Sequence, residues 1–191
     1  MGLAMPGVNL IKPRRIVDDR GWFSETYSRK VAFDIGITDD FVQDNHSLSR
    51  RAGTLRGLHF QTPPYAQAKL IRCTRGKLMD YAVDLRRDSP TYGQHVAAEL
   101  SAENGWQLFV PIGFAHGFIT LEPDTEVVYK VTNYYSPEHD GGIRFDDPNI
   151  AINWVAQSND LILSDKDLRL PTLADFDSPF VYDGTPLAPL K

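Results

Sequence analysis

The sequence predicts an all-β fold, an antiparallel sandwich or barrel built from short strands. Apolar and polar residues alternate with a period of two over several short runs, as they do in strands that bury one face. Turn-forming residues separate these runs at about ten-residue spacing, which is typical of antiparallel sandwiches and barrels. Few segments carry the longer period of a helix, so a few short peripheral helices are expected.

Three runs show the alternation most clearly. Residues 78–85 place apolar side chains on one face and Asp80 and Asp84 on the other. Residues 125–132 alternate in the same way, and a third period-two set occupies residues 150–154. The turn signals that bound these and the neighbouring strands are Arg75-Gly76, Asp88-Ser89-Pro90, Glu103-Asn104-Gly105, Pro123-Asp124, Gly141-Gly142 and Asp146-Asp147-Pro148.

Two short helices are expected at the edge of this fold. Ser28 is a suitable N-cap for one that runs to Ile35, and a second lies near residues 165–168. No repeat, low-complexity segment or linker divides the chain, so residues 1–191 are expected to form a single domain. The proline-containing residues 175–191 are expected to form an extended tail that either wraps onto a neighbour or is loose.

Composition and charge narrow the class of protein. The 191 residues are 42% hydrophobic and 24% charged, which excludes a disordered chain and a coiled coil. The 20 Lys and Arg against 25 Asp and Glu give a net charge of −5 without a basic stripe, so no nucleic-acid partner is expected. Arginines cluster at 14–15, at 50–51, at 56 and at 72 and 75. Most are interpreted as solvated surface, although a few could hold a small anion such as a diphosphate.

No segment suggests a membrane or a secretory route. The longest apolar-leaning stretch, residues 109–121, contains proline and glycine and falls short of the roughly 20 apolar residues of a membrane helix. In residues 1–15 the basic cluster follows the short apolar part, the reverse of a secretory signal. The single cysteine, Cys73, cannot form an intrachain disulfide, so a cytoplasmic location is expected.

Two histidine motifs indicate the type of β fold. Residues 105–116 have the spacing of the second cupin motif, a glycine, five residues and then PxGxxH, which ends here at His116. The first cupin motif needs HxH and a glutamate to hold a metal, but here Gln61 follows His59 and no glutamate occurs through residue 78. We therefore expect a cupin-type jelly roll that binds no metal and works through acid–base side chains.

Polar residues on the predicted strands are candidates for that chemistry. Lys69 is either a surface lysine or one that points inward at an anion. Tyr129 is either a core residue or a hydroxyl donor. Asp80, Asp84 and Asp167 could each orient a histidine, and their spacing does not choose among them.

Six segments, in order, resemble the dTDP-4-dehydrorhamnose 3,5-epimerase family. They are DDRGWFSETY (18–27), FVQDNHSLSRRAGTLRGLHFQ (41–61), AQAKLIRCTRGKLMDYAVDLRRDSPTYGQ (66–94), VPIGFAHGF (110–118), VYKVTNYYSPEHDGGIRFDDP (128–148) and ILSDKD (162–167). The resemblance spans roughly residues 8 to 172. It implies an isomerase that inverts two carbons beside a ketone in a nucleotide sugar and needs no cofactor. It also implies a homodimer with exchanged strands.

The resemblance assigns four catalytic residues. The histidine of the RGLHxQ motif, His59, is the base, and the aspartate of SxKD, Asp167, orients it. The tyrosine of YKxT, Tyr129, is the acid on the opposite face of the sugar. The lysine of QxKL, Lys69, stabilises the enolate.

The resemblance also implies contacts with the substrate. The residues that match these family positions are Arg20, Phe23, Glu25, Gln43, Asn45, Arg56 and His116, and Asp140 is a further candidate contact. The chain departs from the family at Phe145, where the family often has tryptophan, and at Asp140, the acidic residue before the glycine pair. In an unbroken strand Arg56 and His59 would face opposite ways, so we expect Gly57 to kink the strand and bring both to one site.

The function that the resemblance implies is conversion of dTDP-4-dehydro-6-deoxy-D-glucose to dTDP-4-dehydro-L-rhamnose, for dTDP-rhamnose and polysaccharide biosynthesis. An alternative is an epimerase that inverts only carbon 3 or only carbon 5 of a related nucleotide-linked 4-ketosugar. A sugar-binding cupin without catalysis would not need an opposed acid and base. A metal-dependent cupin dioxygenase would need the HxH motif that this sequence lacks.

Overall fold

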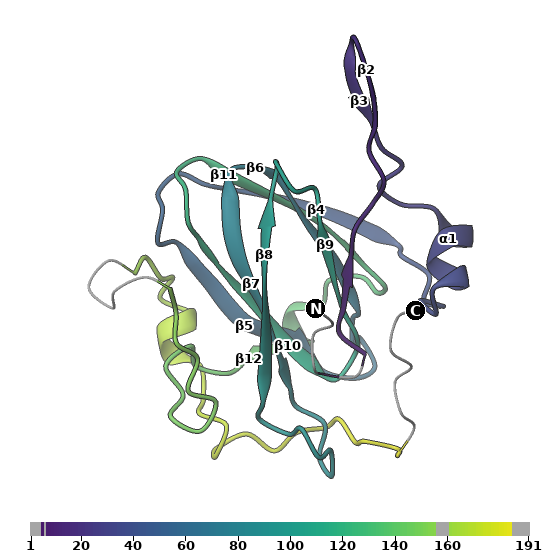
Figure 1. The fold of residues 1–191 in the computed structure, drawn as a ribbon. Helices are drawn as coiled ribbons and strands as arrows, with labels where there is room; N and C mark the ends of the chain where they lie inside the picture. Colours follow the sequence, from purple (N-terminus) through teal and green to yellow (C-terminus); the bar gives the residue numbers. More distant parts are fainter. Residues whose placement is uncertain (1–4, 6, 156–160, 185–191) are drawn as a thin grey trace.

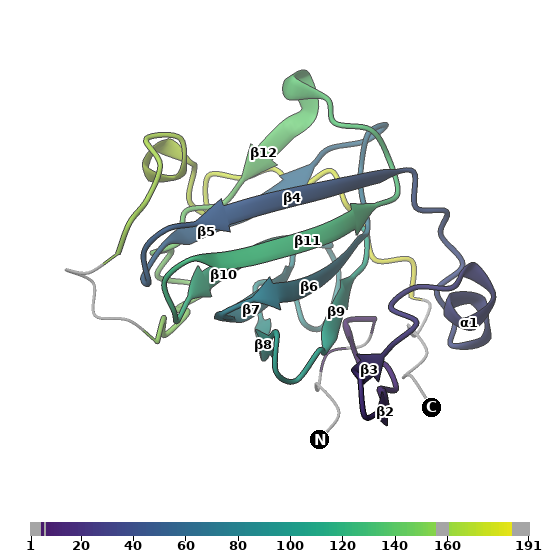
Figure 2. The same ribbon diagram turned by 90° about the horizontal axis from the view of Figure 1, so that it is seen from above.

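The computed structural model describes residues 5, 7–155 and 161–184, which form two antiparallel five-stranded sheets packed face to face (Figures 1 and 2). The first sheet has the order β1 (Asn9–Ile11), β9 (Gln107–Val110), β6 (Lys69–Arg75), β11 (Thr125–Val131), β4 (Gln43–Ser49). The second has the order β12 (Asp140–Gly142), β5 (Leu55–Gln61), β10 (Phe114–Thr120), β7 (Lys77–Asp84), β8 (His95–Ser101). This architecture confirms the predicted antiparallel β-sandwich.

A core of apolar side chains lies between the two sheets. Ile71 and Val127 from the first sheet meet Leu78 and Leu100 from the second, and all four are fully buried. Cys73, the single cysteine, is buried in the same cluster. Burying each large aliphatic side chain contributes about 1.5–3 kcal/mol, so this layer holds the two sheets together.

The alternation over residues 78–85 corresponds to β7, but neither of its faces meets water. Leu78 and Ala82 join the core between the sheets, and Val83 joins a second cluster on the outer face. Asp80 and Asp84 are both fully buried. Both faces of this strand are covered because the segment that follows β12 packs over the outer face of the second sheet.

The period-two set at residues 150–154 is not a strand, and that prediction was wrong. Ile150, Ile152 and Trp154 do turn toward the outer cluster, while the residues between them are exposed. Trp154 donates its ring N–H to the carbonyl of Phe145 at 2.8 Å. The alternation therefore reflects burial of one side of the segment. An extended segment can bury one side without pairing with another strand.

The Gly141-Gly142 pair was also misread, since it lies in β12 and not in a turn. Asp140 pairs with Gln61 and Gly142 pairs with His59 along the edge of β5. Glycine dipeptides usually mark turns, but here the pair forms an edge strand beside the histidine motif.

Both helix predictions are confirmed in position. The helix α1 (Arg29–Asp34) begins after Ser28, whose hydroxyl accepts the N–H of Val31. The second helix is a single 3₁₀ turn, η3 (Asp167–Arg169), which begins two residues later than expected. Another 3₁₀ turn, η1, spans Pro137–His139. Among the described residues no helix is long and apolar enough to cross a membrane.

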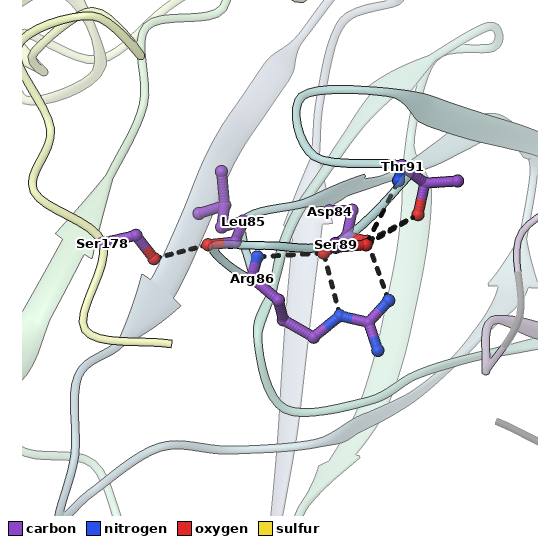
Figure 3. Close-up of polar contacts among 6 residues, drawn as sticks. All are labelled: Asp84, Leu85, Arg86, Ser89, Thr91 and Ser178. Carbon is purple, nitrogen blue, oxygen red and sulfur yellow. Dashed lines mark hydrogen bonds and ion pairs between the residues drawn. The ribbon is translucent and has the colours of Figure 1, made fainter. Parts of the chain in front are cut away.

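A buried polar cluster orders the segment that follows β7, and a serine of the C-terminal segment bonds the backbone beside it (Figure 3). Asp84 accepts hydrogen bonds from Arg86 at 2.7 and 2.9 Å, from Ser89 at 2.6 Å and from Thr91 at 2.7 Å. Burial would raise the pKa of Asp84, but these hydrogen bonds outweigh it and lower the pKa. The hydroxyl of Ser178 donates to the carbonyl of Leu85. The tail from residue 175 to 184 therefore packs on its own chain, and residues 185–191 lie outside the described part.

A two-stranded ribbon, which we call the arm, projects from the end of the sandwich (Figure 1). The arm comprises residues 16–23 and consists of β2 (Ile16–Asp18), a tight turn and β3 (Gly21–Phe23). Every residue of both strands is exposed, including Val17, Trp22 and Phe23. An exposed apolar ribbon of this kind is a surface for contact with another molecule.

Candidate active site

A cavity of about 390 Å³ lies between the two sheets and is lined by side chains from both. The second sheet supplies Arg56, His59 and His116, and the first supplies Lys69 and Tyr129. The loop around η3 closes one side with Ser164, Lys166 and Asp167. Six residues that the sequence singled out are thus brought to one place from four strands and a 3₁₀ turn.

His59 and Asp167 form a hydrogen-bonded pair at the edge of this cavity. Nε2 of His59 lies 2.6 Å from Oδ1 of Asp167, and Asp167 is buried. Burial raises the pKa of Asp167, but the hydrogen bond and the charge of His59 outweigh it, so the net shift is downward. Because Nε2 is engaged, Nδ1 is the ring nitrogen that remains available for proton transfer.

A local irregularity in β5 allows Arg56 and His59 to line the same cavity. On the neighbouring strand β10, His116 pairs with His59 and Phe118 pairs with Arg56, so β5 carries one extra residue over this interval. Gly57 lies in this interval with φ +140°, and a Cβ atom there would lie 2.5 Å from the Cα of Gly117. The expected kink at Gly57 is therefore present.

A second histidine–carboxylate pair lies beside the first. Nε2 of His116 is 2.6 Å from Oδ1 of Asp80, and both side chains are buried. The other carboxylate oxygen of Asp80 has no hydrogen-bond partner among the described residues. Of the three aspartates that the sequence left open, Asp167 contacts His59, Asp80 contacts His116, and Asp84 contacts Arg86 instead.

Lys69 points inward from β6. Its ammonium group donates to the backbone carbonyl of His59 at 3.3 Å. Burial lowers the pKa of Lys69 to about 8, and the negative charges of Asp140 and Asp80 limit the shift. A cation with a lowered pKa inside a cavity suits an anionic or electron-rich ligand.

Tyr129 enters the cavity from β11, on the sheet opposite His59. Burial raises its pKa, with Arg56 acting in the other direction, so the phenol is protonated at neutral pH. The cavity therefore has a basic group on one wall and a protonated acid on the other. That arrangement can remove a proton from one side of a ligand and supply one from the other side.

The remaining predicted contacts lie outside the lining of this cavity. Gln43 and Asn45 bond to each other at 2.9 Å on β4, where Asn45 pairs with Tyr129. Asp140 accepts from Tyr135 at 3.1 Å and from Lys166, which lines the cavity.

Three further predicted residues, Arg20, Phe23 and Glu25, are on or next to the arm. Arg20 is 90% exposed and pairs with Asp18 at the tip of the arm. Phe23 and Glu25 line a different, largely apolar cavity of about 590 Å³ between α1 and the base of the arm. Within one chain the fold does not bring these residues to His59.

Sequence reasoning gave no role to four polar residues that line the cavity, Ser47, Thr54, Ser164 and Lys166. Lys166 directly precedes Asp167 in the ILSDKD segment, so its place in that motif is a signal that could have identified it. Ser47 lies on the same face of β4 as Asn45, and its hydroxyl has no hydrogen-bond partner within the described part of the chain.

The potential metal ligands of the cavity include two histidines. Each of them bonds a carboxylate through Nε2. In the described residues no group of three His, Cys, Asp or Glu side chains is placed to hold a metal ion.

The antiparallel sandwich and its cavity, with a histidine–carboxylate pair on one wall and a protonated tyrosine on the other, define a class of protein built for acid–base proton transfer. Comparison with known proteins then identifies the family. The family profile described as dTDP-4-dehydrorhamnose 3,5-epimerase matches residues 2–175. The chain belongs to the dTDP-4-dehydrorhamnose 3,5-epimerase family.

Individual relatives are similar over nearly the whole chain. The dTDP-4-dehydrorhamnose 3,5-epimerase of Sinorhizobium fredii is 54% identical over 184 residues, 94% of this chain and 92% of that protein. The crystal structure of the Bacillus anthracis enzyme, with TDP and PPi bound, has a TM-score of 0.85 at 51% identity and covers 89% of this chain and 98% of that one. The Legionella pneumophila dTDP-6-deoxy-D-glucose-3,5-epimerase, in complex with dTDP-4-keto-L-rhamnose, has a TM-score of 0.90 at 40% identity and covers 95% and 97%.

Proposed function

We propose that this protein converts dTDP-4-dehydro-6-deoxy-D-glucose to dTDP-4-dehydro-L-rhamnose by inverting carbons 3 and 5. The observation that carries the proposal is the cavity with the His59–Asp167 pair on one wall and Tyr129 on the opposite sheet. The family membership supports the substrate class, because the relatives bear that name and one is bound to dTDP-4-keto-L-rhamnose.

The chemistry begins with His59 as the base. Asp167 holds Nε2, and Nδ1 takes the proton from the carbon next to the ketone. The electrons of that C–H bond move to the ketone oxygen and form an enolate. Such a proton has a pKa far above 7, so the enolate needs a nearby cation, and Lys69 supplies it.

Inversion is completed by Tyr129. Its hydroxyl gives a proton to the same carbon from the opposite face, the enolate returns to a ketone, and solvent restores His59 and Tyr129 to their starting states. The second carbon beside the ketone then undergoes the same two steps. His116 and Arg56 line the same wall as His59 and contact the sugar or its phosphates.

The remaining contacts come from a homodimer in this proposal. The exposed arm of one subunit reaches the cavity of the other and supplies Arg20 and Phe23, with Glu25 behind them. The exposure of Phe23 (67%) and of Arg20 (90%) supports this assignment, since most of each side chain is accessible to another molecule. Gln43, Asn45 and Asp140 complete the substrate contacts. The single buried cysteine is consistent with a cytoplasmic location, which we also propose.

The test of this function is NMR of the purified protein with dTDP-4-dehydro-6-deoxy-D-glucose in heavy water. The proposal expects deuterium at carbons 3 and 5 together with formation of the L-rhamno product. Deuterium at one carbon only would identify a monoepimerase, and no exchange would leave a sugar-binding protein.

Activity is expected to survive exhaustive treatment with EDTA. The HxH motif is broken, and among the described residues no three His, Cys, Asp or Glu side chains are grouped to hold a metal ion. The measurement is turnover before and after chelation, with metal content followed in parallel. Loss of turnover that one divalent metal restores would overturn the cofactor-free mechanism.

Activity is also expected to decline as the pH rises above about 8. The pKa of Lys69 is about 8, so the stabilising ammonium is present below that pH and is lost above it. Above that pH, kcat should fall by about tenfold per pH unit, the slope of one lost proton. Asp140→Asn removes a charge that raises this pKa and should move the decline to lower pH. A decline that begins only near the ordinary lysine pKa of about 10.4 would show that Lys69 is not the group.

A further inference from the structure

The base of the arm is held by one arginine. Arg15 immediately precedes β2, and its guanidinium donates to the backbone carbonyl of Ala102 at 2.7 Å and to that of Glu103. The same guanidinium lies 4.2 Å from the ring centroid of Trp22, on the returning strand of the arm. One side chain therefore contacts both the body of the sandwich and the second strand of the ribbon.

The turn that receives Arg15 is ordered by its own hydrogen bonds. Asn104 accepts from the N–H groups of Ser101 at 3.1 Å and Trp106 at 2.9 Å, and donates to the carbonyl of Glu99 at 3.0 Å. These bonds direct the carbonyls of residues 102 and 103 toward the arm. A planar guanidinium suits two adjacent acceptors, because its donors are arranged in a rigid fork.

Gly105 provides the space that the guanidinium occupies. Gly105 has φ +62°, and a Cβ atom there would lie 2.6 Å from Nη2 of Arg15. Next to it, the ammonium of Lys12 lies 4.1 Å from the ring centroid of Trp106. Two cations of the segment before the arm are thus placed on the 101–106 region of the same chain.

We propose that Arg15 is a positioning residue for substrate binding, which sets the direction in which the arm presents Arg20 and Phe23. The inference rests on the proposed function, in which those two residues contact the substrate in the other subunit. An arm held in one direction binds without a large ordering cost, whereas a released arm must lose that freedom at each binding event. Arg15 does not touch the reacting atoms, so it affects binding and not the chemical step.

The test compares three variants in steady-state kinetics with dTDP-4-dehydro-6-deoxy-D-glucose. Arg15→Met should raise KM by about tenfold with kcat unchanged, because a preorganised contact is lost. Arg14→Met removes the same charge from the neighbouring residue, which is exposed and makes no hydrogen bond within the described part of the chain, and should leave KM near the wild-type value. Arg20→Ala reports whether the arm contacts substrate at all.

Limited trypsin digestion supplies a readout of arm order that does not depend on activity. Cleavage after Arg20, followed by mass spectrometry, should be faster in Arg15→Met than in Arg14→Met. Gly105→Ala keeps the arginine at position 15 but puts a methyl group where its guanidinium lies. This variant should also speed cleavage and raise KM. Thermal unfolding of each variant shows whether the sandwich itself is intact.

The outcomes separate the inference from the function on which it rests. A higher KM in Arg20→Ala with a wild-type KM in folded Arg15→Met would overturn the role of Arg15 and leave the arm as a substrate contact. A wild-type KM in both would overturn the arm as a substrate contact, and the role of Arg15 with it. A fall in kcat without a change in KM in Arg15→Met would also contradict the inference.

Discussion

Replacing His59 by alanine is expected to lower deuterium uptake at both carbons by at least roughly a hundredfold, the loss typical of removing a general base. His59 lines the cavity on the sheet opposite Tyr129, and the carboxylate of Asp167 holds its Nε2. Substrate binding should change little, because arginine and aromatic side chains carry most of it. The measurement is NMR-detected exchange in heavy water at saturating substrate, with dissociation of the dTDP sugar measured separately.

The control for this experiment is His46→Ala. His46 is an exposed histidine on β4 that pairs with Glu126 at 3.1 Å and lies outside the cavity. Its loss should leave exchange close to the wild-type rate. Near-normal exchange in His59→Ala would show that another residue removes the proton, and His116 would become the first candidate because it also lines the cavity.

Tyr129→Phe should separate proton removal from inversion. The change deletes one hydroxyl and keeps the aromatic ring, so the fold should lose at most about 1 kcal/mol, the typical contribution of a hydrogen bond. His59 should still form the enolate and then return a proton to the original face. In heavy water the substrate should therefore gain deuterium while net inversion slows much more than exchange. In the wild-type protein, exchange and inversion should stay coupled.

Two other results would assign Tyr129 differently. Equal loss of exchange and inversion would mean that the hydroxyl is needed to form or stabilise the enolate. No loss of either would make Tyr129 a packing residue, with the acid elsewhere. Tyr134→Phe is the matched variant, since Tyr134 is a 63% exposed tyrosine on the segment after β11 and does not line the cavity.

Local patterns in the sequence were sufficient for the class of fold. Alternation over residues 125–132 became β11, and Ser28 capped α1 as expected. These features depend on neighbours in the chain, so a short window of sequence contains the information. The same reasoning failed at residues 150–154, because one-sided burial does not require a partner strand.

The family motifs nominated the residues of the candidate site and implied that Asp167 orients His59, whereas residue spacing alone could not pair them. Lys69 and Tyr129 each had two interpretations, and the structure places both in the cavity. Three aspartates were open as partners for a histidine. Asp167, which pairs with His59, is 108 residues away from it in the chain. Spacing along the chain carries no information about such a contact.

By itself the sequence determined an antiparallel β fold and its family, and it nominated the candidate acid–base residues. Only the tertiary structure decided that His59 and Tyr129 lie on opposite sheets and that Asp80 serves His116. It also decided that the arm projects away from the cavity of its own chain and that Arg15 bonds the base of the arm to the sandwich. The physical reason is that the alternation of a strand follows from the burial of its own side chains. The way two sheets pack against each other and the direction in which a ribbon projects depend on contacts between distant segments.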